Sequence, residues 1–174
     1  MPDGVFQVAV VTPEERLVDT EARTLVLRSS DGDLTVLDGH TPLVTDVVPG
    51  PVRVEPADGE PVQLAVHGGY LQVDTGPTPE TPEGSVPVRT TRVTLLAGVA
   101  ELRDQIDVPR AERARDEAQA AVESLRAATG RTGTSPTPTA GSEEEGQSAE
   151  EIELVAAESA LRRAEVRLEV AAPA

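Results

Sequence analysis

The spacing of apolar residues changes once along this 174-residue chain, and that change constrains the fold more than any other feature. From Val5 to about Leu96, apolar residues alternate with polar ones in short runs, as in Phe6, Val8 and Val10. A period of two is typical of strands that bury one face. Past Glu101, apolar residues recur at intervals of three and four, as on one side of a helix. The pattern therefore predicts a β-rich domain over residues 1–101 and a helical segment over residues 102–174.

Turn residues divide the first part into strands. Ser30-Asp31-Gly32 and Asp58-Gly59 each separate two apolar runs, and this arrangement indicates hairpins. Short strands at this spacing predict a β-sandwich, in which each sheet covers the apolar face of the other. Gly76–Thr91 contains four prolines and shows no periodicity, so we expect an exposed, flexible loop there. The predicted strands after the first are Thr24–Arg28, Leu34–Leu37, Val52–Glu55, Val62–His67, Tyr70–Asp74 and Arg92–Ala97.

Two helices are predicted in the second part, at about 107–129 and 149–171. Asp107 suits the N-cap of the first helix and Gly130 suits its end. Ser148 to Glu151 has the spacing of a capping box for the second helix. The intervening 130–148 is rich in Thr, Ser, Pro, Gly and Glu, which predicts a flexible linker and hence an antiparallel helical hairpin. The apolar stripes are Ala111, Ala114, Ala118, Val122 and Leu125 on the first helix and Leu154, Ala157, Leu161, Ala164 and Leu168 on the second.

Composition excludes several classes of function. The formal net charge of −16 argues against a nucleic-acid partner, because binding to phosphates needs a basic surface. All 15 cationic residues are arginine, so no GxxxxGK phosphate-binding loop or Schiff-base lysine is present. The chain has no cysteine, and the spacing of its two histidines does not suggest a metal site. We expect no catalytic or metal site and no required cofactor.

Four segments, in order, resemble the epsilon subunits of bacterial F-type ATP synthases. They lie at the junctions predicted above, although Gly98 stands where the family usually has Asp. The resemblance implies a β-sandwich followed by a helical hairpin, and a non-catalytic subunit of the central stalk. The segments are SDGDLTVLDGHTPLVTDVVPGPVRV from Ser30, AVHGGYLQV from Ala65, RVTLLAGVAE from Arg92 and IDVPRA from Ile106.

The resemblance also implies partners and a location. It implies contacts with the gamma subunit, the ring of c subunits and the catalytic alpha and beta subunits, at the cytoplasmic face of the bacterial plasma membrane. It places the Asp31–Pro42 region near the end of the sandwich that contacts the rotor, through Asp31, Asp38, His40 and Pro42. The hairpin is expected to act as a two-state brake on ATP hydrolysis.

A regulatory ATP site is a second implication of the resemblance. In several bacterial members the motif that matches Asp107, Arg110 and Ala111 binds ATP. Glu101 matches a contributing residue on the sandwich, and the second helix offers Arg163 and Arg167. An arginine beside a helix N-terminus suits phosphate. The simpler interpretation makes Asp107 only an N-cap and Arg110 only a member of a surface ion pair.

Two alternatives remain open at this point. One alternative to the ATP synthase subunit is a stand-alone β-sandwich binding module with a helical dimerisation stalk. The other is a hydrolase that uses His40 or His67 with a nearby acid. His40 lies between Asp38-Gly39 and Thr41-Pro42, so a structural role in a turn is the simpler interpretation. His67 precedes a glycine pair, which is typical of a strand end.

Overall fold

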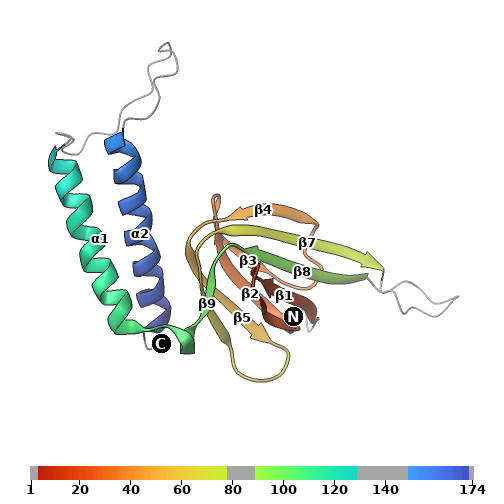
Figure 1. Ribbon diagram of the computed structural model, residues 1–174. Coiled ribbons are helices and arrows are strands. Elements are labelled where there is room, and N and C mark those ends of the chain that lie inside the picture. The colour runs from red at the N-terminus through yellow and green to blue at the C-terminus, as the bar shows by residue number, and fades with distance from the viewer. Residues whose placement is uncertain (1–3, 78–88, 129–148, 173–174) are drawn as a thin grey trace, which may run out of the picture. The chain divides into compact units, whose positions relative to one another are not determined.

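Alternating burial confirms the predicted strands in the first part of the chain. The computed structural model describes residues 4–77, 89–128 and 149–172. Phe6, Val8 and Val10 of β1 point inward, and apolar residues from β1 to β8 form one core (Figure 1). The strands are β1 Phe6–Val11, β2 Arg16–Ser29, β3 Gly32–Val36, β4 Leu43–Val47, β5 Gly50–Pro56, β6 Val62–Val66, β7 Gly69–Pro77, β8 Arg89–Ala97 and β9 Ala100–Leu102.

The strands form two layers, and β2 joins them because it pairs with strands of both. One layer is β1-β8-β7-β4, in which β1 and β8 are parallel, and the other is β3-β2-β5-β6-β9. The 14-residue β2 pairs with β1 through its first half and with β3 and β5 through its second half. The two layers therefore belong to one continuous hydrogen-bonded network. The core is almost wholly aliphatic, because Phe6 is its one aromatic residue.

Both predicted hairpins are present. Ser29 pairs with Gly32 at the β2–β3 turn, and β5 pairs with β6 across the Asp58-Gly59 turn. The sequence pattern missed β4, because Val44 points outward while Thr45 lies on the opposite face, which obscures the apolar alternation. It also missed β9, which has only three residues.

The ends of the predicted proline-rich loop belong to strands. Thr75, Gly76 and Pro77 of β7 pair with Thr91, Thr90 and Arg89 of β8, because glycine and proline can lie at the end of a ladder. The rest of that loop, 78–88, lies outside the described residues, as does the predicted linker 130–148 with Gly130 and Ser148.

The second part contains two helices, α1 Val108–Ala128 and α2 Ala149–Ala171, which run antiparallel (Figure 1). The predicted stripe on α1 is confirmed, since Ala111, Ala118 and Val122 are buried. On α2, Ala164 is buried as predicted, but Val166 and Val170 are buried too. These valines lie outside the stripe because two residues correspond to about 200° of helix rotation. The structure thus buries more than one side of α2 toward its end.

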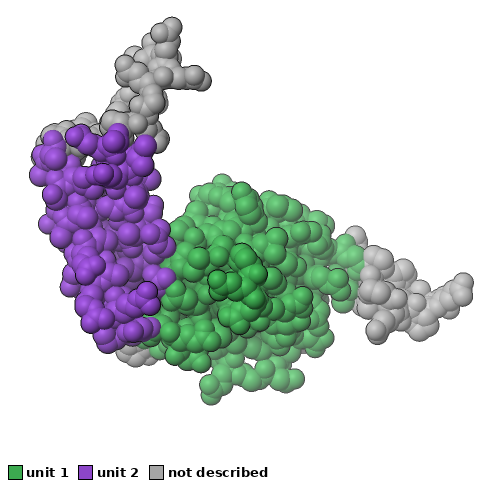
Figure 2. Space-filling view, viewed as in Figure 1, with its two compact units in different colours: residues 1–106, 169–174 green, residues 107–168 purple. Residues whose placement is uncertain are grey.

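Backbone contacts divide the chain into two units, shown in separate colours in Figure 2. The sheet unit comprises residues 1–106 and 169–174, and the hairpin unit comprises residues 107–168. The division after Ile106 lies five residues beyond the boundary predicted after Glu101, because β9 and the 3-10 turn Arg103–Gln105 continue the sheet unit.

Candidate functional site

The outer face of the β1-β8-β7-β4 layer exposes large apolar side chains. Val44 is 71% exposed, Tyr70 64% and Leu96 50%. The strand register aligns Val11, Leu96, Tyr70 and the exposed Asp46 in one row across β1, β8, β7 and β4. Val44 lies two residues before Asp46 on β4 and points to the same side. We call Val11, Val44, Tyr70 and Leu96 the apolar outer face. Exposed apolar surface of this kind marks sites of protein–protein contact.

A groove of about 720 Å³ adjoins this face. Tyr70 and Leu96 line it together with Pro13, the backbone of Gly68-Gly69 and Gly98. Gly69 has a φ of +153°, and a Cβ at this position would overlap the carbonyl oxygen of Leu96. Close approach of the two backbones therefore shapes the floor of the groove, and this approach requires glycine.

The other layer presents a polar outer face. Arg28 of β2 donates a hydrogen bond to Asp33 of β3 at 2.8 Å, and Arg53 pairs with Glu55 on β5 at 3.1 Å. The hydrogen bond and charge of Asp33 raise the pKa of Arg28 above its ordinary value. We call Arg28, Asp33, Thr35, Arg53 and Glu55 the polar outer face. Charged residues such as Asp46 and Arg92 are exposed on the first layer as well, so what distinguishes that layer is its exposed Val44, Tyr70 and Leu96.

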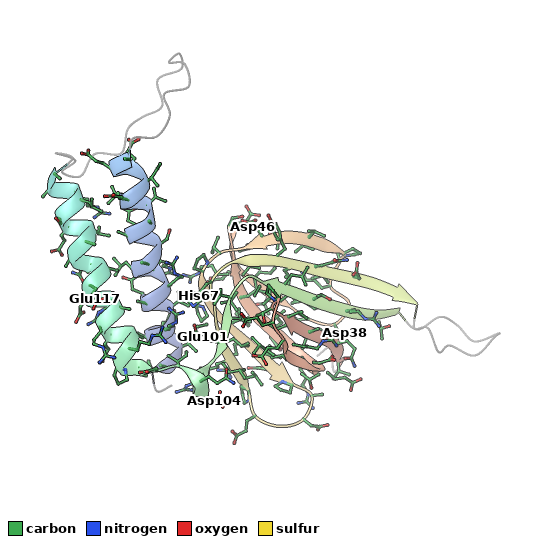
Figure 3. All side chains as sticks on the ribbon, viewed as in Figure 1. Asp38, Asp46, His67, Glu101, Asp104 and Glu117 are labelled. Atoms are coloured by element: carbon green, nitrogen blue, oxygen red, sulfur yellow. The ribbon has the colours of Figure 1, made fainter. Side chains whose placement is uncertain are left out.

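The four residues predicted to contact the rotor do not lie together. Asp31 occupies the β2–β3 turn, whereas Asp38, His40 and Pro42 follow the other end of β3. The five residues of β3 span about 13 Å. Ser30, beside Asp31, donates a hydrogen bond to Asp46 at 2.7 Å, and Figure 3 shows Asp46 and Asp38 at opposite ends of the sheet unit. Three of the four residues therefore belong to one loop, and Asp31 belongs to another.

The loop of Asp38, His40 and Pro42 is tied to the sheet by hydrogen bonds. The Gly39 N–H donates to Thr91 Oγ1 at 2.8 Å, and the Thr75 hydroxyl donates to the His40 carbonyl at 2.9 Å. The His40 N–H also donates to the Leu37 carbonyl at 3.1 Å. These bonds hold the turn through its backbone and do not depend on the His40 side chain.

His67 is far from His40. It lies two residues before β7 begins, whereas the carbonyl of His40 is bound at Thr75, near the end of β7. Six residues of strand separate these points by about 20 Å. The backbone N–H of His67 donates to the Val99 carbonyl at 3.0 Å. Within the described residues, no three His, Cys, Asp or Glu side chains are grouped as metal ligands.

The residues predicted to bind ATP are divided between the two units. Asp107 caps α1, since its Oδ1 accepts a hydrogen bond from the Arg110 N–H at 3.0 Å. Arg110 is exposed, and Ala111 is buried one turn into the helix. Arg163 and Arg167 lie one turn apart in the second half of α2, which leads to the end of the hairpin where α1 starts (Figure 1). Glu101 lies on β9 in the sheet unit and pairs with Ala65.

Comparison with known proteins identifies the family. A model described as "ATP synthase, Delta/Epsilon chain, beta-sandwich domain" matches residues 5–77. An ATP synthase epsilon chain from Desulforudis audaxviator is 35% identical over 119 residues, covering 68% of this chain and 75% of the relative. The chain belongs to the ATP synthase epsilon chain family. The epsilon chain of Streptomyces coelicolor is 38% identical over 114 residues, covering 66% of this chain and 80% of the relative.

The solved structures agree on the fold. A chain in the Euglena gracilis mitochondrial ATP synthase superposes with a TM-score of 0.64 at 21% identity, over 96% of this chain and 81% of that one. Epsilon chains are non-catalytic subunits of ATP synthase, so family membership favours the subunit over the stand-alone module and the hydrolase. Neither of the two described helices combines the length and apolar character needed to cross a bilayer.

Sequence reasoning missed the apolar outer face, although a signal was present. Leu95 and Leu96 are consecutive in a strand, so one of them must point outward. Tyr70 alternates with the buried Leu71, which places it on the outer side as well. The pairing of these two outward residues depends on the β7–β8 register, which a single sequence does not fix.

Proposed function

We propose that this epsilon-family chain docks on the gamma subunit and the c-ring as one rotor, and thereby couples proton flow to ATP synthesis on other subunits. The proposal rests on the apolar outer face. A permanent interface within a rotor buries apolar area, and the β1-β8-β7-β4 layer exposes Val44, Tyr70 and Leu96 among polar and charged residues. We assign the apolar outer face to gamma, at the cytoplasmic side of the bacterial plasma membrane.

A charge placed on the apolar outer face tests this assignment. The side chain of Leu96 is half exposed on β8, so Leu96→Asp should fold and yet place an unpaired carboxylate in the interface. We expect its Kd for purified gamma, measured by calorimetry, to rise at least about tenfold. Thr35→Asp adds the same charge to the polar outer face and should bind gamma as the wild type does. Equal affinity of all three proteins would refute docking through this face.

The hairpin supports a regulatory proposal. In a packed state, the hairpin would permit ATP hydrolysis. In an extended state, along gamma toward the alpha and beta subunits, it would obstruct rotation. The stripe of α1 is built from Ala111, Ala118 and Val122, which bury little area each, so packing along it stabilises the hairpin only modestly and a ligand or partner could shift it.

ATP is the regulatory ligand that we propose for the hairpin. Arg110 is exposed beside the capped start of α1, and Arg163 and Arg167 lie toward the same end of the hairpin. Together with Glu101, Asp107 and Ala111 they would form the site, and bound ATP would favour the packed state by its differential affinity. A calorimetric titration with ATP tests this proposal.

A further inference from the structure

A small side chain on the outer side of the β1-β8-β7-β4 layer leaves a hollow of about 330 Å³. Ala9 of β1 is half-buried there, and the strand register places Asp19 of β2 and Thr94 of β8 on either side of it. Two residues away along β1, Gln7 and Val11 point to the same side as Ala9. Longer side chains thus surround a single methyl group. We call this space, lined by Gln7, Ala9, Arg16, Asp19, Arg92 and Thr94, the Ala9 hollow.

The acidic side chains of β2 beside the Ala9 hollow already have hydrogen-bond donors. Asp19 accepts a hydrogen bond from Arg16, with which it also forms an ion pair. Glu21, which lies opposite Gln7 in the β1–β2 ladder, accepts a hydrogen bond from Gln7 Nε2 at 3.3 Å. Both carboxylates are therefore engaged within the sheet unit.

Arg92 lies at the rim of the Ala9 hollow, exposed on β8 beside Gln7. Asp74, its cross-strand neighbour on β7, accepts a hydrogen bond from Gln72 at 2.8 Å. Within residues 4–77, 89–128 and 149–172, no acidic side chain forms an ion pair with Arg92. A guanidinium can bind a carboxylate through two parallel hydrogen bonds, so the group that suits this rim is a carboxylate.

We propose that the Ala9 hollow receives an acidic side chain of gamma, whose carboxylate pairs with Arg92 and fixes the position of gamma along β8. The inference rests on the proposed function, which brings gamma to this layer, and adds the chemistry that gamma must present there. Val11 belongs both to the Ala9 hollow and to the apolar outer face. Leu96 and Arg92 are four residues apart on β8, or about 13 Å, so one interface can cover both.

This pair would select the partner, not attract it from a distance. The net charge of −16 favours a gamma surface that is cationic as a whole, and the long-range field would therefore not draw a carboxylate to the sandwich. In contact, however, a gamma that lacks the carboxylate would cover Arg92 and leave its charge desolvated and unpaired. Arg92 is thus assigned as a residue that determines specificity.

Calorimetry of the full chain with purified gamma tests the role of Arg92. Arg92→Gln removes the charge and keeps a polar side chain, so the Kd should rise about tenfold. Arg53→Gln is the matched control, because it changes the net charge equally but lies on the polar outer face. Its Kd should stay within twofold of the wild type.

Ala9→Val tests the shape of the Ala9 hollow. Valine suits a strand, and its additional methyl groups occupy the space that the acidic side chain needs. The Kd for gamma should rise at least about fivefold. Thr35→Val, at an exposed threonine of β3, should bind gamma as the wild type does. Urea unfolding of each variant separates lost affinity from lost stability.

Substitutions in gamma identify the acidic partner. Each aspartate or glutamate of gamma is changed in turn to asparagine or glutamine. One change should weaken binding of the wild-type chain and have no further effect on Arg92→Gln. Wild-type affinity of Arg92→Gln or of Ala9→Val, together with weakened binding of Leu96→Asp, would overturn this inference and leave docking through the apolar outer face standing. Wild-type affinity of Leu96→Asp would instead contradict the proposed function.

Discussion

At the scale of single residues, Gly69 shows how a backbone requirement shapes a surface. It lies between His67-Gly68 and Tyr70, at the start of β7, against the carbonyl of Leu96. The backbones of Gly69 and Leu96 are in close contact, and both residues line the groove beside the apolar outer face. A side chain at this position would separate β7 from β8 and disturb the row of Tyr70 and Leu96.

We expect Gly69→Ala to destabilise the sheet unit by about 2 kcal/mol or more, because its Cβ overlaps backbone atoms that cannot rotate away. Urea unfolding measures this change. Gly98→Ala is the control, since a Cβ there meets no atom within 4 Å, and its free energy of unfolding should change by at most about 0.5 kcal/mol. Equal stability of the two variants would contradict the close packing of β7 on β8.

At the scale of elements, the start of α1 combines a structural role with a proposed ligand. The Asp107 cap satisfies one backbone donor, and Arg110 extends from the same turn. Arg110→Ala should abolish the heat of ATP binding in calorimetry, because it removes the guanidinium nearest the helix N-terminus. Arg126→Ala, at the other end of α1, should retain that heat. A wild-type chain that releases no heat would leave Arg110 as a surface residue only.

Elements whose signal is local could be predicted from sequence. The alternation of Phe6, Val8 and Val10 and the Asp107 cap depend on neighbouring residues, and the structure confirms both. β4 was missed because its outward Val44 and inward Thr45 reverse the expected alternation of apolar and polar residues. The apolar outer face, the Thr75–Thr91 pair and the separation of Asp31 from Asp38 all depend on register and strand direction. These properties arise from pairing between strands whose residues are far apart in the sequence.

At the scale of the whole molecule, an acidic sandwich carries the proposed contact with gamma. The net charge of −16 disfavours acidic partners. The apolar outer face contributes the area that this contact buries. Docked in this way, a non-catalytic subunit would transmit rotation and leave chemistry to other subunits.

The central claim is tested most directly by ATP-driven proton pumping in bacterial membrane vesicles stripped of their own epsilon subunit. Adding the wild-type chain should restore acidification of the vesicles, and Leu96→Asp at the same concentration should restore less, because it docks on gamma more weakly. A chain lacking residues 107–174 should restore pumping and raise ATP hydrolysis, because the brake is gone. If the folded wild-type chain neither binds the stripped complex nor restores pumping, its role as a coupling subunit is contradicted.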